Sequence, residues 1–546
     1  MKRLSFSVLF LAACGAGSTS APPTSVDAGA DAAAAEVAAE DLPTPPADLG
    51  LEEVAPPPDV AAEDVPDVPD VPAPPSSSES VLQHHKNATR DGLYVAPTFT
   101  HAAAAGLALD ASFSAKLEGP VYAQPLYVEG TPDLVVVVTE RDVVWAFDAA
   151  TGAVAWKSQV GDPVPLDALP CGNIDPLGIT STPVADLESR RLYLDAMTTP
   201  DGGKTKQHLV FALSLNDGAV APGWPVDVSA LAKDNGHGFD SEVQNQRGAL
   251  LLRSGVVYVP YGGHWGDCGE YNGWLIGVPV DDPAHPVAWA ARATGGATWA
   301  PSGVAADDTG IFITTGNTFG ATTWSDGEAI IRFDEGPVFS QEPKDYWAPT
   351  NWKTLDNQDL DIGGSGPVLF DVPGATPSKL TIALGKDGKA YLLDRTNLGG
   401  VSKALATLQA ADDTIIGAAA TYRTALGTYV VFKGVGAGCP GGEGAGLVAL
   451  RVGAAAPPTL SVAWCAEVDT LGSPMVTTTD GTTDPIVWVA GAEGDKKLHG
   501  FDGDTGEVVY TQTGAMGSIK RYTTPIVAKG RLFVGGNDAV YAFKPL

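Results

Sequence analysis

Short runs of β-branched and aromatic residues follow one another along residues 110–546, separated by turns rich in Gly, Asp and Pro. The first group has four such runs, at residues 125–128, 134–139, 143–148 and 154–160. Apolar runs of this length between turn residues are typical of β-strands. The pattern therefore predicts units of four short strands.

The start of each unit has a recurring signature, a small or polar residue followed by Pro and an apolar pair. It occurs as Gln124-Pro125-Leu126-Tyr127, Thr182-Pro183-Val184-Ala185, Gly366-Pro367-Val368-Leu369, Ser473-Pro474-Met475-Val476 and Thr524-Pro525-Ile526-Val527, with a weaker copy at Ala300-Pro301-Ser302-Gly303. Two of the intervals between successive copies are about twice as long as the others. Degraded copies of the signature, near residues 248–250 and 420–422, lie within these two intervals. The eight units repeat at about 57 residues, which predicts an all-β fold, an eight-bladed β-propeller of four-stranded blades.

The turn between the third and fourth predicted strands carries a specific motif. Residues 146–156 read Ala-Phe-Asp-Ala-Ala-Thr-Gly-Ala-Val-Ala-Trp, and residues 500–510 repeat the pattern with Tyr at the end. This motif resembles the eleven-residue repeat of pyrroloquinoline-quinone (PQQ)-type propellers. Gly supplies the left-handed turn position, Asp and Thr bind turn amides, and the final aromatic docks between blades. The motif is structural and does not itself bind quinone.

The two ends of the repeat region predict how the ring closes. The last unit stops after its third strand, at residues 540–543, while residues 113–119 resemble a spare fourth strand. Pairing them would leave no open sheet edge. Upstream, Asn87, Arg90 and Gly92 are similar to the segment that precedes the first blade in bacterial quinoprotein-like propellers of unassigned role.

The N-terminus predicts export and a lipid anchor. Residues 1–14 read as a signal peptide, with Lys2-Arg3, an apolar stretch and a sequence ending at Cys14 that resembles the lipobox of bacterial lipoproteins. An ordinary secretory signal is the alternative. Gly15 after the lipidated Cys favours the bacterial outer membrane or cell surface, and a body on the periplasmic side is also compatible.

Residues 15–80 predict a disordered acidic tether before a folded body at 81–546. This segment has 14 Asp or Glu, 13 Pro, no Lys or Arg and no aromatic residue. Such a composition cannot bury enough apolar surface to offset the loss of chain entropy. A plain spacer is the simpler interpretation, and an acidic binding tail is the alternative.

The net charge of the chain limits the classes of molecule that it is expected to bind. The chain carries a formal charge of −32, which disfavours nucleic acid and anionic lipid headgroups. No apolar run reaches the length of a membrane-spanning helix, so Cys14 is the expected membrane contact. We expect a monomer.

Four further cysteines, an even number in an exported chain, predict disulfides. Topology favours Cys171–Cys268 and Cys439–Cys465, because the members of each pair lie in loops or strands that a propeller brings to one face. Free buried thiols are the alternative.

The same face collects unusual loops that form a candidate ligand site. Gly-rich loops there place His, carboxylates and aromatics together, a composition that suits a protein or carbohydrate partner. The candidates are His237, Asp240, His264, Trp265, Asp267, Glu270, Tyr271, Asn272, Asn317, Trp324 and Asp326. Alternatively, these residues satisfy their own turns. No residue is assigned to catalysis or to a metal.

Three functions remain open. The favoured one is a lipid-anchored, non-enzymatic binding or interaction scaffold without a cofactor, similar in architecture to the lipoprotein propeller of the outer-membrane β-barrel assembly machinery. A second is an alcohol or sugar dehydrogenase dependent on PQQ and calcium, although many such enzymes have adjacent cysteines that this chain lacks. A third is carbohydrate capture or adhesion at the rim.

Overall fold

A computed structural model of the chain describes residues 78–440 and 445–546. The predicted signal peptide with Cys14, and all of the predicted tether before residue 78, lie outside the described residues. Within the described part, no helix is long and apolar enough to cross a membrane.

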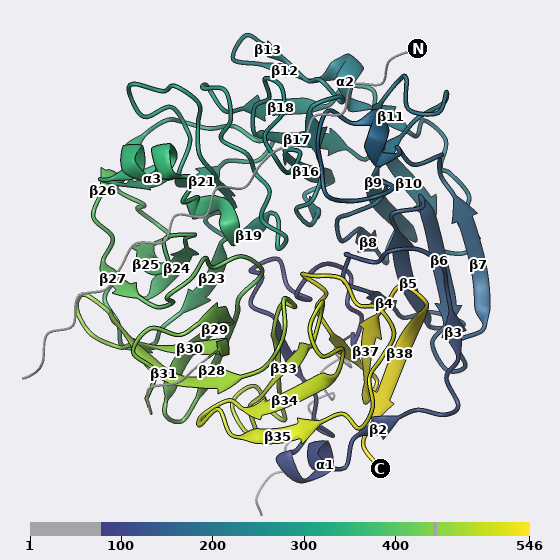
Figure 1. Cartoon of the computed structure of the whole chain (residues 1–546), viewed down its shortest axis with the longest axis vertical. Helices are drawn as coiled ribbons and strands as arrows, with labels where there is room; N and C mark the ends of the chain where they lie inside the picture. The colour runs from purple at the N-terminus through teal and green to yellow at the C-terminus, as the bar shows by residue number, and fades with distance from the viewer. Residues whose placement is uncertain (1–77, 441–444) are drawn as a thin grey trace, which may run out of the picture. The chain divides into compact units, whose positions relative to one another are not determined.

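Eight β-sheets are arranged around a common axis, with the last beside the first (Figure 1). Blade 1 consists of β4 (Leu126–Val128), β5 (Leu134–Thr139), β6 (Val143–Asp148) and β7 (Val154–Gln159), and blade 2 consists of β8 (Val184–Asp186), β9 (Arg191–Thr198), β10 (Gln207–Ser214) and β11 (Val226–Asp227). Blade 3 consists of β15 (Leu251–Arg253), β16 (Val256–Gly263), β17 (Trp274–Pro279) and β18 (Val287–Ala290), and β14 (Gln244–Asn245) also pairs with β16. Blade 4 consists of β19 (Ala305–Asp307), β20 (Gly310–Thr315), β21 (Ala329–Phe333) and β22 (Tyr346–Pro349). The predicted four-strand unit and its boundaries in blade 1 are confirmed to within one residue at either end.

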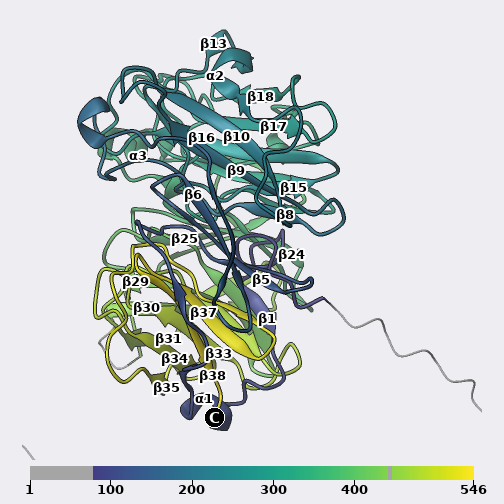
Figure 2. The same cartoon turned by 90° about the vertical axis from the view of Figure 1, so that its right-hand side faces the viewer.

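The second half of the ring follows the same plan. Blade 5 consists of β23 (Val368–Asp371), β24 (Lys379–Leu384), β25 (Lys389–Asp394) and β27 (Ala406–Gln409), and blade 6 consists of β28 (Ala420–Thr424), β29 (Gly427–Val435), β30 (Ala445–Gly453) and β31 (Thr459–Glu467). Blade 7 consists of β32 (Met475–Thr478), β33 (Ile486–Ala490), β34 (Leu498–Asp502) and β35 (Val508–Thr511). Blade 8 consists of β36 (Ile526–Ala528), β37 (Arg531–Gly535) and β38 (Ala539–Lys544). Figure 2 shows the ring from the side, with blades 2 and 3 at the top and blades 6 to 8 at the bottom. The two degraded signatures do begin blades 3 and 6, so the predicted count of eight is confirmed.

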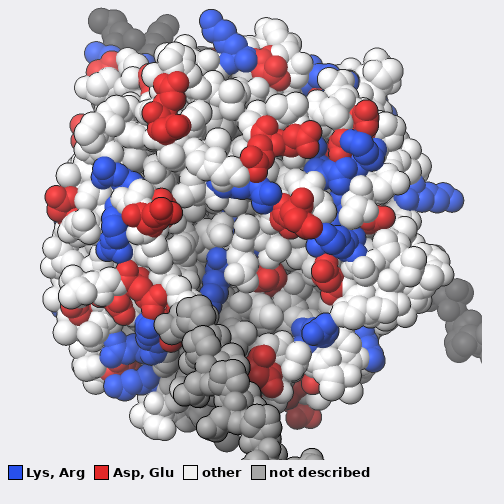
Figure 3. Space-filling model, turned by 180° about the vertical axis from the view of Figure 1, so that it is seen from behind, with Lys and Arg blue, Asp and Glu red and all other residues white. Residues whose placement is uncertain are grey.

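A few short elements lie outside the blades. They are α1 (His101–Ala105), α2 (Val228–Leu231), α3 (Trp352–Gln358), the hairpin of β12 (Lys233–Asp234) and β13 (His237–Gly238), and β26 (Gly400–Ser402), which pairs with β22. On the face seen in Figure 3, acidic and basic side chains are interspersed where the surface is not covered by grey atoms, and no continuous basic patch is visible there.

The repeated turn motif acts as the sequence predicts. The Asp148 Oδ1 atom accepts hydrogen bonds from the backbone of Ala150 and Thr151 and from the Thr151 hydroxyl, and Gly152 has a φ of +77°. The buried Trp156 donates from Nε1 to the Leu215 carbonyl of the next blade, at 2.9 Å. The turn therefore shapes its own blade while its terminal aromatic ties neighbouring blades together.

Blade 8 is completed by the N-terminal part of the chain. β2 (Ala108–Leu109) and β3 (Ala115–Lys116) both pair antiparallel with β38 and supply its missing outer neighbour. Phe113 packs edge-on against Phe533 of β37, with 5.6 Å between the ring centroids. The predicted closure by residues 113–119 is confirmed, although the paired part is shorter and β2 adds to it.

The segment 79–95 crosses the middle of the ring and contacts every blade, a feature the sequence did not predict (Figure 1). The contacts run in chain order: Glu79 with Lys529 of blade 8, Val81 with Tyr127 of blade 1, Leu82 with Ala185 of blade 2, Ala88 with Ala306 of blade 4, Thr89 with Leu369 of blade 5, Asp91 with Thr421 of blade 6, and β1 (Leu93–Val95) in parallel with β32 of blade 7. The side chain of Arg90 reaches the Leu250 carbonyl of blade 3. We call residues 79–95 the axial segment.

Candidate functional site: an axial cavity

Several loops that precede the blades, and several between the second and third strands of a blade, line a cavity of about 480 Å³ near the ring axis. Residues of both loop types line it, from blade 1 round to blade 8. They include Tyr122, Arg247, His264, Trp299, Asn317, Asp361, Lys386, Glu493, Lys520 and Tyr522. A smaller cavity shares Tyr122, Arg247 and Tyr522 with this one and is also lined by His84. His84 of the axial segment therefore lies beside residues that also line the main cavity.

One wall holds an aromatic ring fixed by charged groups. Trp299 donates from Nε1 to Asp361 Oδ2 at 3.1 Å. The Lys386 Nζ atom lies 2.9 Å from the same carboxylate oxygen, 2.8 Å from Asp359 Oδ1 and 5.3 Å from the Trp299 ring centroid. The backbone N–H of Asn317 donates to Asp361 Oδ1 at 3.0 Å. Burial raises the pKa of Asp361, while the ammonium of Lys386 acts to lower it.

Two cations at the cavity lack a carboxylate partner. Arg521 is paired with Glu493 at 2.6 Å and Lys386 with its two aspartates. Within residues 78–440 and 445–546, neither Arg247 nor Lys520 forms an ion pair, although both line the cavity. Lys520 instead lies 5.7 Å from the ring centroid of Tyr122. The cavity therefore offers positive charge to a ligand beside an aromatic wall.

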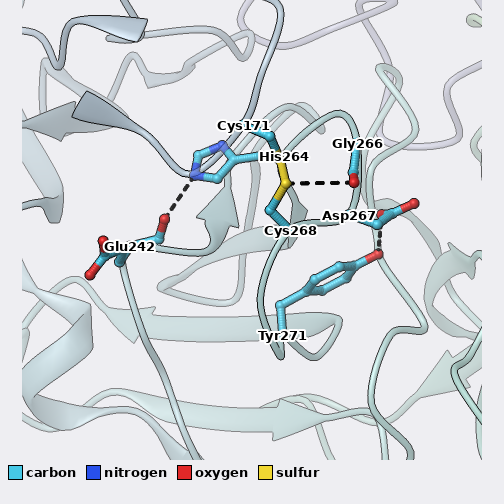
Figure 4. Close-up of a disulfide and its surroundings, with 7 residues drawn as sticks. All are labelled: Cys171, Glu242, His264, Gly266, Asp267, Cys268 and Tyr271. Carbon is cyan, nitrogen blue, oxygen red and sulfur yellow. Dashed lines mark hydrogen bonds between the residues drawn. A yellow bond between two sulfur atoms is a disulfide. The ribbon is translucent and has the colours of Figure 1, made fainter. Parts of the chain in front are cut away.

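The rim on the blade 3 side is braced by a disulfide (Figure 4). Cys171, in the loop before blade 2, is bonded to Cys268, in the loop between β16 and β17, and Cys439 is bonded to Cys465 in blade 6. Both predicted pairings are confirmed. The Tyr271 hydroxyl donates to Asp267 Oδ1 at 2.6 Å, so the braced loop also has an internal hydrogen bond.

Two other rim side chains differ in exposure. His264 is buried, its Nε2 lies 3.2 Å from the Glu242 carbonyl oxygen, and burial lowers its pKa to about 4. Its imidazole is therefore neutral at pH 7. Trp265 is 63% exposed at the cavity mouth.

The structure divides the candidate residues into two groups. Those that line the axial cavity are His264, Trp265, Asp267, Tyr271 and Asn317. The other six, which do not line it, are His237, Asp240, Glu270, Asn272, Trp324 and Asp326.

Several of these six have local structural contacts. Asp326 is buried in an ion pair with Arg292, and Trp324 stacks on Tyr346 at 4.0 Å. Asn272 donates to the carbonyls of Ala291 and Ala293, and Asp240 accepts from the backbone of Glu242. His237 lies on β13 and Glu270 is exposed.

Sequence reasoning missed the residues that carry most of the cavity's charge, namely Arg247, Asp361, Lys386, Lys520 and Arg521, and the aromatic Trp299. A signal for many of them exists. Trp299 comes directly before the signature of blade 4, Arg247 directly before blade 3, and Lys520-Arg521-Tyr522 directly before blade 8. Since each signature begins an innermost strand, the residues just upstream face the axis.

The comparisons with known proteins agree with this architecture. The family described as "Outer membrane protein assembly factor BamB" matches residues 107–259. The protein is a PQQ-like β-propeller. No curated protein matches the chain as a sequence.

Solved structures resemble this PQQ-like propeller at low sequence identity. The quinohemoprotein alcohol dehydrogenase ADHIIG from Pseudomonas putida HK5 has a TM-score of 0.59 and 14% identity, covering 86% of this chain and 80% of that one. The quinohemoprotein alcohol dehydrogenase from Comamonas testosteroni has a TM-score of 0.56 and 15% identity, with 85% and 80% covered. BamB from Moraxella catarrhalis matches at 13% identity with a TM-score of 0.35, covering 83% and 96%. At these identities the likeness to the dehydrogenases shows the fold alone.

Proposed function

We propose that the PQQ-like propeller is a binding protein whose axial cavity takes a planar, anionic small molecule. The observation that supports this proposal is that Arg247 and Lys520, which form no ion pair with any described residue, line the same cavity as Trp299. The indole of Trp299 is held in place by its hydrogen bond to Asp361. An aromatic face suits a flat ring, and cations in a partly enclosed site suit carboxylates. A cavity of about 480 Å³ lies in the size range typical of small-molecule sites.

A quinone that carries carboxylates is the first ligand class to test. The residues present fit such a group, because Trp299 would face its rings and Arg247, Lys520 and Lys386 its carboxylates. A calcium ion beside it has less support. Over the described ranges, no three His, Cys, Asp or Glu side chains are placed together to hold a metal.

Dehydrogenase activity is a second candidate function, and Asp361 is the observation that favours it. A bound quinone would supply the two-electron acceptor for oxidation of an alcohol or sugar. Asp361 is a buried carboxylate in the cavity wall, and burial raises its pKa, which suits a group that receives a proton. The similar solved structures include quinohemoprotein alcohol dehydrogenases.

Titration of the purified chain with PQQ, followed by calorimetry, tests the binding. We expect one site per chain. Replacing both Arg247 and Lys520 by alanine should weaken the affinity by at least about 100-fold, because each charge-assisted hydrogen bond is worth roughly 1.5–3 kcal/mol. The exposed Lys403→Ala is the matched control and should bind as the parent does.

Two outcomes decide between the candidates. Absence of PQQ binding at millimolar concentration would contradict the proposed ligand class. If PQQ binds, dye reduction with alcohols or aldoses that is lost in Asp361→Asn, with binding retained, would establish the enzyme. Binding without turnover supports the binding protein, and the exposed Trp265 at the mouth would then contact a larger partner such as a protein or carbohydrate.

The proposal also places the propeller outside the cytoplasm, held on a membrane by a lipid on Cys14. Two disulfides suit an oxidising compartment. Cys14→Ser removes the acceptor of the lipid, so most of the protein should move from the membrane fraction to the soluble fraction. Fractionation and immunoblotting measure this, with Cys439→Ser as a control that keeps Cys14. Unchanged membrane partitioning of Cys14→Ser would show that no lipid at this residue holds the protein.

A further inference from the structure

A second group of polar side chains lies buried near the junction of blades 1 and 2, outside the wall of the axial cavity. Glu140 and Asp142 stand in the tight loop between β5 and β6, and both residues are fully buried. Glu140 Oε2 accepts from the Gly178 backbone N–H at 2.8 Å. Glu140 Oε1 and both carboxylate oxygens of Asp142 have no hydrogen-bond donor among the described residues. Three buried carboxylate oxygens are therefore left without compensation.

No neighbouring group removes this negative charge. Arg247 and Lys520 act on Glu140 only from a distance, without an ion pair. Asp195, on β9, also acts on Asp142, but its own oxygens are satisfied by His208 at 2.8 Å and by the Tyr261 hydroxyl at 2.8 Å. Glu140 and Asp142 are therefore the carboxyl groups here whose oxygens lack a compensating partner in the described part of the chain, and burial raises the pKa of both.

Other oxygen atoms converge on the same place. The Thr180 hydroxyl is buried beside the Glu140 carboxylate and acts to lower the pKa of that group, but no hydrogen bond of normal geometry joins it to any described residue. Gly178 packs closely against the same loop, because a Cβ there would lie 2.5 Å from the Glu140 carbonyl oxygen and 2.6 Å from Asp142 Oδ1. Carboxylate, hydroxyl and carbonyl oxygens thus lie close together beside Gly178, in the loops of blades 1 and 2.

We propose that Glu140, Asp142 and Thr180 form a binding site for a hard cation of the calcium class between blades 1 and 2. Such ions take oxygen ligands, and two carboxylates match the charge of a divalent ion. An uncompensated buried carboxylate is costly, so burial without a counter-ion is the less stable arrangement. The site contains two acidic residues and is completed by neutral oxygens. It is separate from the axial cavity, and the ion would join loops of two neighbouring blades.

Removal of the ion is the direct test. The purified full chain is treated with a chelator, dialysed, and then given CaCl2. We expect one tightly bound calcium ion per chain by elemental analysis. We also expect the melting temperature to rise on the order of 3 °C once calcium is well above its dissociation constant.

Isosteric variants assign the site. Glu140→Gln and Asp142→Asn should each lose the bound ion and the calcium-dependent rise in melting temperature. Asp387→Asn is the matched control, because Asp387 lies in the corresponding loop of blade 5 and its buried carboxylate is already paired with Lys389 and Tyr391. It should keep the calcium response.

The remaining outcomes overturn the proposal. A parent chain with no bound calcium and the same melting temperature with and without CaCl2 would mean that the two carboxyl groups are simply protonated. Calcium retained in both isosteric variants would place the ion elsewhere. If a variant does not fold, the bound calcium and the melting temperature of the parent chain, with and without CaCl2, still test whether the protein binds the ion.

Discussion

Replacing Arg90 by alanine should lower the free energy of unfolding by about 3–5 kcal/mol, because it leaves buried carbonyls of three chain segments without a donor. The Arg90 side chain is fully buried. It donates to the carbonyl oxygens of Val304 at 2.8 Å, His84 at 2.7 Å and Leu250 at 2.8 Å. One side chain therefore joins the axial segment to blades 3 and 4.

The midpoint of urea unfolding measures this effect, and two further variants sharpen it. Arg90→Lys keeps the charge but not the planar set of donors, so it should recover only part of the loss. Arg423→Ala, at an exposed position on β28, should change the midpoint little. If Arg90→Ala unfolded at the same urea concentration as the parent, the axial segment would not contribute to the stability of the ring.

Replacing residues 108–119 by a Gly-Ser linker of equal length should make the unfolding of the ring less cooperative and cause the protein to aggregate. The change removes both strands that pair with β38, together with the buried side chains of Phe113, Ala115 and Leu117. An unpaired strand edge is a template for pairing with other chains. We expect a broadened melting transition and light scattering at temperatures where the parent chain remains clear.

A linker of the same kind in place of residues 233–238 is the control, because β12 and β13 form a hairpin outside the blades. It should leave the transition sharp. Equal melting of the parent and the 108–119 variant would show that the ring closes without β2 and β3.

The sequence predicts the blades well because the information is local and repeated. Asp148, Thr151, Gly152 and Trp156 lie within nine residues, and the side-chain hydrogen bonds of Asp148, Thr151 and Trp156 stay within the turn or reach the next blade. Ring closure is also predictable, because a unit that ends one strand early matches a spare strand elsewhere. These features follow from turn chemistry and from the need to pair every edge.

The cavity was only partly predictable because its wall is assembled from positions far apart in the chain. Trp299, Asp361 and Lys386 come from different loops, and only the closed ring brings them together. The loop at 262–273 is unusual in composition, and six of its residues do line the cavity. For the charged residues before the blades, such as Arg247 and Lys520, the signal is their position ahead of a blade signature and not their local composition.

The axial segment was missed for a different physical reason. It is too short and irregular for a strand pattern, and apart from β1 most of its backbone bonds are single contacts with successive blades. Its partners are inner strands spread over the whole chain, so no window of sequence contains the interaction. The resemblance that includes Arg90 marks the segment before the first blade, but a buried arginine cannot be told from an exposed one in the sequence.

The route of the axial segment has a mechanical consequence. A pull applied at residue 78 enters the molecule through bonds to Lys529, Tyr127 and Ala185, in blades 8, 1 and 2, and then through successive bonds to the other blades. The load thereby passes from one blade to the next in turn instead of peeling one outer strand from its sheet. Each bond must rupture before the next is strained, and the outermost bonds, nearest residue 78, would yield first. A propeller held by its N-terminus would resist drag through the part of its structure that touches all eight blades.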